Sequence, residues 1–402
     1  MPADLSPRII PEPLRGADSG TFAHSSVVER LPEIVRRTID ENDFRAQVID
    51  DLENLIEEIP LAVMRALADP FAPDAESWTA FVAIHAGLNW LEVPWFFAEF
   101  YFYRRVLEAT GYFQAGEQGY LVDPFLEQKT QGLRHSINSI EGLAAELNAW
   151  PEIMPSQLDC IEALLIKSLW GNRADLSMWP VDGGNNEEPA PAKEHILLNA
   201  AEQIAEHLSS KRERVDIVLD NAGFEFAADL FLADFMLQSD VVQQVFLHPK
   251  AYPIFVSDVI HPDLLTTLER LEDQSLPQAS MIASRLSRFL ENGQLCIHED
   301  LFWTSPLALW EIPPSLHAEL AKSDLVIFKG DANYRRLLGD RHWPFEKPFE
   351  EIVNYFPAPI AALRTLKSEV VCGLTPGQIG DLSAEDPEWM VNGRWGLIQF
   401  RG

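Results

Sequence analysis

The sequence is poor in cysteine and contains no long apolar run. Its three cysteines, Cys160, Cys296 and Cys372, are too few and too scattered for a disulfide framework or a cysteine-rich zinc site. No apolar stretch reaches the roughly 18–20 residues that cross a bilayer, and the polar, proline-containing start differs from a secretory signal. These features predict a cytoplasmic protein, with the nucleus as the alternative, and no membrane partner.

Basic residues are also scarce. The chain has 31 Lys and Arg against 62 Asp and Glu, which gives a formal net charge of −31. This excess repels phosphate backbones and anionic lipids over long range, so we expect no nucleic-acid partner. A small anionic ligand would need local positive charge or a bound metal ion.

Several common catalytic motifs are absent. There is no Walker loop and no Gly-x-Gly-x-x-Gly after an apolar run, which disfavours the ordinary nucleotide and dinucleotide sites. The ten histidines form no His-Glu-x-x-His or His-x-His pattern, and no Gly-x-Ser-x-Gly occurs. Zincin and α/β-hydrolase chemistry are therefore disfavoured as well.

What is present suits a large globular protein. The 402 residues, of which 47% are hydrophobic, exceed the roughly 250–300 residues at which a single core stops growing, so one large or two interlocked domains are expected. Composition and periodicity divide the chain into four regions. These are an arm at 1–25, a mainly helical region at 26–177, a linker or exposed loop rich in Pro, Gly and Asn at 178–194, and an α/β catalytic domain at 195–402.

The helical region is predicted from apolar residues that recur every three or four positions, such as Leu31, Ile34 and Val35. Residues 93–106 are unusually aromatic and predict a helix buried on most of its sides. On periodicity alone these residues form a helical core.

The last region alternates between apolar runs and amphipathic segments, which predicts a three-layer, largely parallel, Rossmann-like α/β sheet. The pattern predicts helices at 195–209, 222–237 and 262–272, and strands at 214–219, 244–248, 254–257, 324–328, 369–372 and 395–400.

Polar residues follow two of these apolar runs. Asp220 and Asn221 come after the first strong strand, and Asp258 follows the run 254–257. Open α/β sheets bind ligands at the carboxyl ends of their strands, and carboxylate and amide oxygens suit magnesium or manganese better than zinc. For each residue alone the alternative is structural, since Asp and Asn are common helix caps and turn residues.

Two further segments could supply positive charge. Residues 329–333, Lys-Gly-Asp-Ala-Asn, follow another apolar run, and Gly330 would allow close backbone approach to a ligand. Arg364 and Lys367 lie in an apolar segment. The functional interpretation is a phosphate clamp, in which Lys329 and Lys367 neutralise the anion opposite a metal ion; an exposed turn and surface snorkelling are the structural alternatives.

Taken together, these motifs resemble the metal-dependent damage-control phosphatases, in the branch also known as acidic-residue, or protein-glutamate, O-methyltransferases. The resemblance covers most of the chain, and the carboxyl-terminal Arg-Thr-x-Lys looks like the signature of that branch. It is carried by residues 170–176, 220–225, 255–258, 329–333 and 364–367.

The resemblance implies a helical region packed on an α/β domain that binds a divalent metal, manganese or nickel with cobalt or magnesium as alternatives. Family substrates include fructose 1-phosphate and fructose 6-phosphate. The implied metal ligands are Asp220, Asn221 and Asp258, and the implied substrate contacts are Asp220, Asn221, Lys329, Gly330, Asp331, Ala332, Asn333, Arg364 and Lys367.

We therefore expect hydrolysis of a small phosphomonoester, with Asp220, Asn221, Asp258 and Asp331 as the catalytic residues. Asp331 would orient a water or a sugar hydroxyl, and Asp220 could instead attack phosphorus. Two alternatives stay open: S-adenosylmethionine-dependent methyl transfer to protein glutamate, although the glycine-rich turn of such enzymes is missing, and a non-catalytic phosphosugar-binding protein. The oligomeric state is also open, and a monomer is compatible with the sequence.

Overall fold

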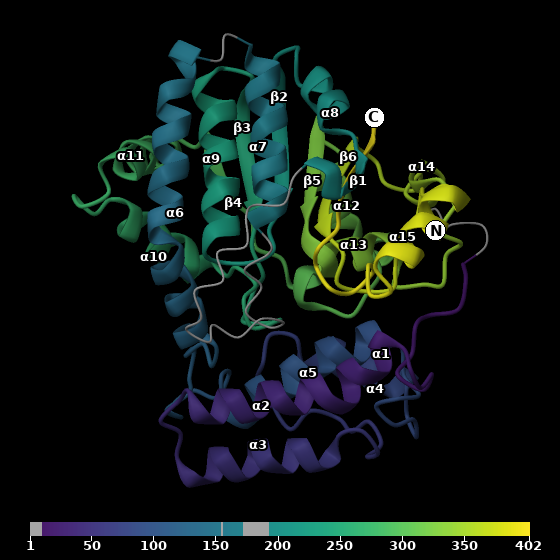
Figure 1. Cartoon of the computed structure of the whole chain (residues 1–402). Coiled ribbons are helices and arrows are strands. Elements are labelled where there is room, and N and C mark those ends of the chain that lie inside the picture. The colour runs from purple at the N-terminus through teal and green to yellow at the C-terminus, as the bar shows by residue number, and fades with distance from the viewer. Residues whose placement is uncertain (1–9, 154–155, 172–192) are drawn as a thin grey trace.

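The computed structural model of the protein describes residues 10–153, 156–171 and 193–402. A layer of amino-terminal helices lies beneath a sheet that carries helices on both faces (Figure 1). Most of the linker predicted at 178–194 lies outside the described residues, as do residues 172–176 of the family motif. The last two linker positions, Lys193 and Glu194, open a 3-10 helix, η3 (Lys193–His195).

The amino-terminal layer is built around one buried helix, α5. Of its sixteen residues, all but Glu108 and Ala109 are buried, which confirms the helix predicted over 93–106. It ends at Gly111, whose φ of 73° supplies the left-handed conformation common after a helix. The elements of the layer are α1 (Phe22–Ser25), η1 (Ser26–Arg30), α2 (Leu31–Asp40), α3 (Ala46–Glu58), α4 (Ala75–Ile84) and α5 (Trp95–Thr110).

The sheet has seven strands in the order β1-β7-β6-β5-β2-β3-β4. Strands β6, β5, β2, β3 and β4 are mutually parallel, whereas β7 runs antiparallel to β6 and parallel to β1. The prediction of a largely parallel sheet is confirmed. The strands are β1 (Ile196–Asn199), β2 (Arg212–Val218), β3 (Val242–His248), β4 (Leu295–Ile297), β5 (Leu325–Lys329), β6 (Ile360–Thr365) and β7 (Gly396–Arg401).

Both faces of the sheet are covered, so the domain has the predicted three layers. Successive strand residues point to opposite faces, and Ile217 accordingly packs into one core while Val218 packs into the other. One face carries α6 (Leu126–Ile153), α7 (Gln157–Gly171), α8 (Ala201–His207), α9 (Phe224–Gln238), α10 (His261–Leu271) and α11 (Pro277–Glu291). The other carries α12 (Pro314–Leu320), α13 (Gly330–Leu338), α14 (Phe349–Ile352) and α15 (Pro376–Glu385), and its core continues into the amino-terminal layer. No helix in these described parts is both long and apolar enough to span a bilayer.

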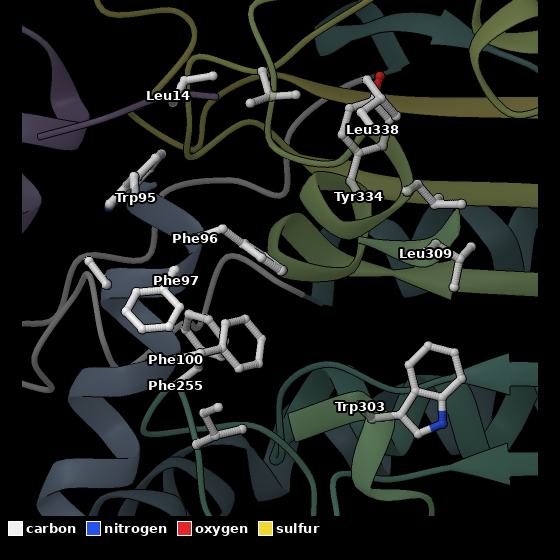
Figure 2. Close-up of a cluster of buried hydrophobic side chains, with 14 of the residues drawn as sticks. Leu14, Trp95, Phe96, Phe97, Phe100, Phe255, Trp303, Leu309, Tyr334 and Leu338 are labelled. Atoms are coloured by element: carbon white, nitrogen blue, oxygen red, sulfur yellow. The ribbon is translucent and has the colours of Figure 1, made fainter. Parts of the chain in front are cut away.

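The strand predicted at 254–257 is wrong. Phe255 and Val256 adopt left-handed backbone conformations, with φ of 52° and 64°, which no strand contains. The Phe255 ring packs against Phe100 of α5 at a centroid distance of 4.9 Å (Figure 2) and against Tyr103 of α5 at 5.1 Å. Within the turn, the Ser257 N–H donates to the Phe255 carbonyl at 2.7 Å. Asp258 therefore lies in a loop instead of ending a strand.

Two other predicted elements differ from the structure. The helix expected at 195–209 is a short strand, β1, followed by α8, because Ile196 pairs with Gly396 at the sheet edge. The strand expected at 369–372 is absent; the strand is β6, further upstream. The chain turns back after β6 because the Arg364 guanidinium donates to the carbonyl oxygens of Ser368, at 2.9 Å, and of Val370.

Candidate active site

Six of the ten predicted site residues, Asp220, Asn221, Asp258, Asp331, Ala332 and Lys367, meet at the carboxyl ends of β2, β5 and β6, where α5 closes over the sheet. A small cavity of about 40 Å³ lies at this junction, at the edge where open α/β sheets bind ligands. The volume accommodates an ion and a few waters, so a phosphorylated metabolite needs the surrounding side chains to move apart. The lining residues are Arg30, Trp95, Glu99, Asp220, Asn221, Phe255, Asp258, Asp331, Ala332, Arg335 and Lys367.

The three predicted metal ligands are brought together by backbone pairing. Asn221 and Asp258 form an isolated antiparallel bridge. On either side of it, the Ala222 N–H donates to the Ser257 carbonyl at 2.7 Å and the Val259 N–H donates to the Asp220 carbonyl at 2.8 Å. The loop after β3 is thus hydrogen-bonded to the segment after β2. No local sequence pattern predicts that these two segments pair.

Hydrogen bonds fix the orientation of the Asn221 amide. Its Nδ2 donates to Asp220 Oδ2 at 2.7 Å and to Glu225 Oε2 at 2.9 Å, while its Oδ1 accepts from Ser257 Oγ at 2.5 Å. The amide oxygen has two lone pairs and keeps capacity for a second interaction. Glu225, four residues on, is buried, so it belongs to the site's support and not to a solvated helix face.

This donor set fits a hard divalent cation. Asp220, Asn221 and Asp258 offer two carboxylates and one amide oxygen around one cavity, which suits an ion that keeps water at its other positions. Across the described ranges no group of three or more His, Cys, Asp or Glu side chains gathers as metal ligands.

A buried lysine that the sequence did not single out supports Asp258. The Lys250 ammonium lies 3.3 Å from Asp258 Oδ2 and donates to the Leu219 carbonyl and to Asn333 Oδ1, both at 3.2 Å. Lys250 thereby joins the end of β2, the Asp258 loop and α13. A single lysine after His-Pro carries no recognisable signal in the sequence.

Helix α13 presents its amino terminus to the cavity through Asp331 and Ala332, where the positive end of the helix favours an anion. Gly330 has a φ of 80°, and a Cβ placed there would lie 1.9 Å from Asp220 Oδ2. Glycine is therefore required because the Asp220 carboxylate sits against this backbone. Asn333 points elsewhere: its Nδ2 donates to the carbonyls of Leu219 and Lys329, at 3.0 and 2.8 Å.

Arg364 and Lys367 are both buried, with exposures of 0% and 4%, which excludes surface snorkelling. Only Lys367 lines the cavity. Arg364 donates from Nε to Asp331 Oδ1 at 2.7 Å, and Ser368 Oγ donates to the same oxygen at 3.0 Å. Arg364 thus positions Asp331 rather than contacting the space where a substrate would bind.

Lys329 does not face Lys367 across the cavity as predicted. Its ammonium lies behind the site and donates to Glu225 Oε1 at 3.0 Å, Asp229 Oδ1 at 2.8 Å and the Ser168 carbonyl at 3.1 Å. Burial disfavours the ammonium, but the carboxylates of Asp229 and Glu225 outweigh that penalty and raise the pKa of Lys329. Burial in turn raises the pKa of Asp229 to about 6. The Lys329 ammonium therefore neutralises the buried carboxylates of Glu225 and Asp229, and Glu225 in turn accepts a hydrogen bond from Asn221.

We expect Lys329→Met to lower the free energy of unfolding by about 3–5 kcal/mol, because it leaves buried carboxylates without their cation. Urea unfolding followed by circular dichroism measures the change. Lys211→Met is the control, since it breaks an exposed pair with Asp240 that contributes at most about 1 kcal/mol. Wild-type stability in Lys329→Met together with weakened phosphate binding would instead support the original clamp.

Comparison with known proteins decides the family. The family model of the damage-control phosphatase ARMT1-like domain matches residues 26–382. The chain belongs to this family. Damage-control phosphatase ARMT1 of Homo sapiens is 33% identical, over 98% of this chain and 99% of that protein. The proteins of the same name from Mus musculus and Danio rerio are each 32% identical, over 97% of this chain and 98% and 97% of theirs.

Among solved structures, a DUF89 family protein from Pyrococcus horikoshii is similar over 92% of this chain and 96% of that chain, at 13% identity and a TM-score of 0.47.

In this member of the damage-control phosphatase family the amino-terminal layer also contributes to the cavity, which the sequence motifs did not predict. Trp95 and Glu99 come from α5 and Arg30 ends η1. Glu99 is the only charged residue in the aromatic run 95–103. A charge inside a segment predicted to be buried needs a partner. Glu99 was therefore the signal in the sequence that this helix contributes to a polar site.

The charges around the cavity favour a metal as the partner of any phosphate. The lining contains four acids, Asp220, Asp258, Asp331 and Glu99, against three bases, Arg30, Arg335 and Lys367. With all of them ionised the lining itself carries one net negative charge, and Lys250 and Arg364 add positive charge behind Asp258 and Asp331. A bound divalent cation would make the lining net positive, which favours a phosphate dianion.

Proposed function

We propose that the protein is a metal-dependent phosphatase that hydrolyses small phosphomonoesters, specifically sugar phosphates such as fructose 1-phosphate and fructose 6-phosphate. One observation carries the proposal. Asp220, Asn221 and Asp258 share a small cavity with Lys367 and the amino terminus of α13. Oxygen ligands for a hard cation therefore lie beside two sources of positive charge for a phosphate, in a family named for phosphatase activity.

The proposed metal ligands are Asp220, Asn221 and Asp258, with Mn²⁺ or Ni²⁺ as the leading candidates and Co²⁺ or Mg²⁺ as alternatives. A divalent ion held there would polarise the phosphate and lower the pKa of bound water. Lys250 and Ser257 hold the ligands in place through Asp258 Oδ2 and Asn221 Oδ1. Asp220 also has the chemistry to attack phosphorus directly.

Lys367 and the first turn of α13 would bind the phosphoryl oxygens, offsetting charge that builds up during transfer. Asp331 would orient the attacking water or a substrate hydroxyl, because Arg364 and Ser368 fix its carboxylate at the cavity wall. Three predicted substrate contacts would instead position other residues. Arg364 holds Asp331, Asn333 accepts a hydrogen bond from Lys250, and Lys329 binds Glu225.

The test is release of inorganic phosphate from fructose 1-phosphate by protein reconstituted with Mn²⁺. We expect a chelator to reduce the rate at least 100-fold, because it removes the cation that would polarise the phosphate and lower the pKa of bound water, and added Mn²⁺ to restore it. Phosphate is quantified colorimetrically, with Mn²⁺ and no protein as the blank. A rate that does not depend on metal would contradict the proposal.

The rival functions give different results in the same preparation. Thermal stabilisation by fructose 1-phosphate without phosphate release would indicate a phosphosugar-binding protein. Tight, stoichiometric binding of S-adenosylmethionine to metal-free protein, measured by calorimetry, would indicate the methyltransferase instead. A panel of sugar phosphates and metals would then rank substrates within the leading proposal.

A further inference from the structure

The lining of the cavity divides into two parts. Lys367, α13 and the three metal-ligand candidates occupy the part that we assign to the phosphate. The remaining wall comes mainly from the amino-terminal layer, through Arg30, Trp95 and Glu99. With a phosphate bound at the first part, the rest of the molecule has to lie against this second wall.

Trp95 carries a polar group without a protein partner. The residue is 1% exposed, and its indole Nε1–H has no hydrogen-bond acceptor among the described residues. A buried donor left unpaired costs about 1–3 kcal/mol. The ring itself is held firmly, because the Arg335 guanidinium lies 3.6 Å from its centroid and Phe22 packs edge-on at 5.9 Å. The side chain is thus fixed at the cavity wall, and its N–H is a buried donor without an acceptor among the described residues.

Glu99 supplies acceptors on the same wall, one helical turn after Trp95. One of its oxygens, Oε2, accepts from Arg335. The other, Oε1, has only long contacts, at 3.4 Å to Arg30 and 3.4 Å to Ser26 Oγ, against about 2.7–2.9 Å for a strong charge-assisted bond. Arg30 is also the more exposed partner, with 20% of its side chain accessible. The Arg30 side of Glu99 is therefore the part of the wall that can open to a ligand.

We propose that Trp95 and Glu99 form the specificity subsite for the alcohol part of the substrate, and that this part is a polyol such as a sugar. The Trp95 N–H donates to one hydroxyl oxygen, and Glu99 accepts from a second hydroxyl once Arg30 moves aside. A site with buried polar groups discriminates strongly against a ligand that cannot pair them. This inference rests on the proposed phosphatase function for the placement of the phosphate.

The experiment compares two non-hydrolysable ligands by calorimetry on Mn²⁺-loaded protein. One is the phosphonate analogue of fructose 1-phosphate, in which a methylene replaces the bridging oxygen; the other is methylphosphonate, which has a similar anionic head and no hydroxyls. We expect Trp95→Phe to weaken the sugar phosphonate about 5- to 10-fold, which corresponds to loss of one net hydrogen bond, and to leave methylphosphonate within about twofold. Glu99→Gln, which retains the shape, should weaken the sugar phosphonate by about 10-fold and should not weaken methylphosphonate, because the change removes a negative charge from the lining.

Trp303→Phe is the matched control. Trp303 is also fully buried with an unpartnered indole N–H, but it does not line the cavity, so both affinities should stay at wild type. Four results would overturn the subsite. The variants could lose affinity equally for both ligands or for neither, Trp303→Phe could show the same pattern, or the wild-type protein could fail to prefer the sugar phosphonate. Selective binding by a wild-type protein that releases no phosphate from fructose 1-phosphate would overturn the phosphatase proposal and leave the subsite standing.

Discussion

Asp258→Asn should reduce metal-supported phosphate release on the order of 10³-fold. Asparagine preserves the shape of the side chain but removes one of the two carboxylate charges offered to the ion. Charge stabilisation by a catalytic metal contributes several kcal/mol to a phosphoryl-transfer step, and about 4 kcal/mol corresponds to three decades in rate. Lys250 is left facing an amide at the position where Asp258 Oδ2 lies 3.3 Å away, so the cavity also gains uncompensated positive charge that opposes the cation.

The measurement pairs Mn²⁺ titration calorimetry with the phosphate-release assay, since a lost ligand should weaken metal binding as well as catalysis. The control is Asp263→Asn. Asp263 is also buried and lies five residues along the chain, but its carboxylate pairs with Lys129 at 2.8 Å and does not line the cavity. The Asp263→Asn variant should lose stability and keep its Mn²⁺ affinity. If Asp258→Asn binds Mn²⁺ as wild type does, Asp258 is not a metal ligand.

The sheet and the phosphate end of the site could be predicted because they depend on local patterns. Strand β5 is buried along its whole length and appears in the sequence as a continuous hydrophobic run, and the buried part of β2 is interrupted only by Asp216. Residues that follow such strands gather at one edge. That rule places Asp220, Asn221 and Asp331 at one edge, whereas Lys367 was joined to them by the phosphate-clamp interpretation and the family resemblance; all four line the same cavity.

The rest could not be predicted because it depends on contacts between distant segments. The left-handed turn at Phe255 and Val256 is held by the packing of the Phe255 ring on α5 and by the Ser257 N–H, which donates to the Phe255 carbonyl; no local preference favours φ above zero for valine. Lys329 has the right charge and position for a phosphate ligand, yet two acids of α9 attract its ammonium to the other side. Trp95 and Glu99 are more than a hundred residues from the phosphate motifs and resemble ordinary core positions.

Gly330→Ala should have the second large effect, by displacing Asp220, a proposed metal ligand, without changing any charge. The added Cβ would lie 1.9 Å from Asp220 Oδ2 and 2.0 Å from Asp220 Cγ, far inside van der Waals contact. Either the Asp220 carboxylate moves or α13 shifts its first turn. A misplacement of about 1 Å in a catalytic group can cost about 100-fold in rate, so we expect at least that loss in phosphate release and a clear loss of Mn²⁺ affinity.

Gly293→Ala separates this displacement from backbone strain. Gly293 has a similar φ of 75°, but a Cβ there meets no atom within 4 Å. Both variants should lose about 1–3 kcal/mol of unfolding free energy from holding alanine in the left-handed region, as measured by urea unfolding. Only Gly330→Ala should also lose metal affinity and turnover, because only its methyl group meets Asp220. Equal Mn²⁺ affinity in the two variants would mean that Asp220 tolerates the shift, and that the close approach of α13 to β2 is structural rather than part of the metal site.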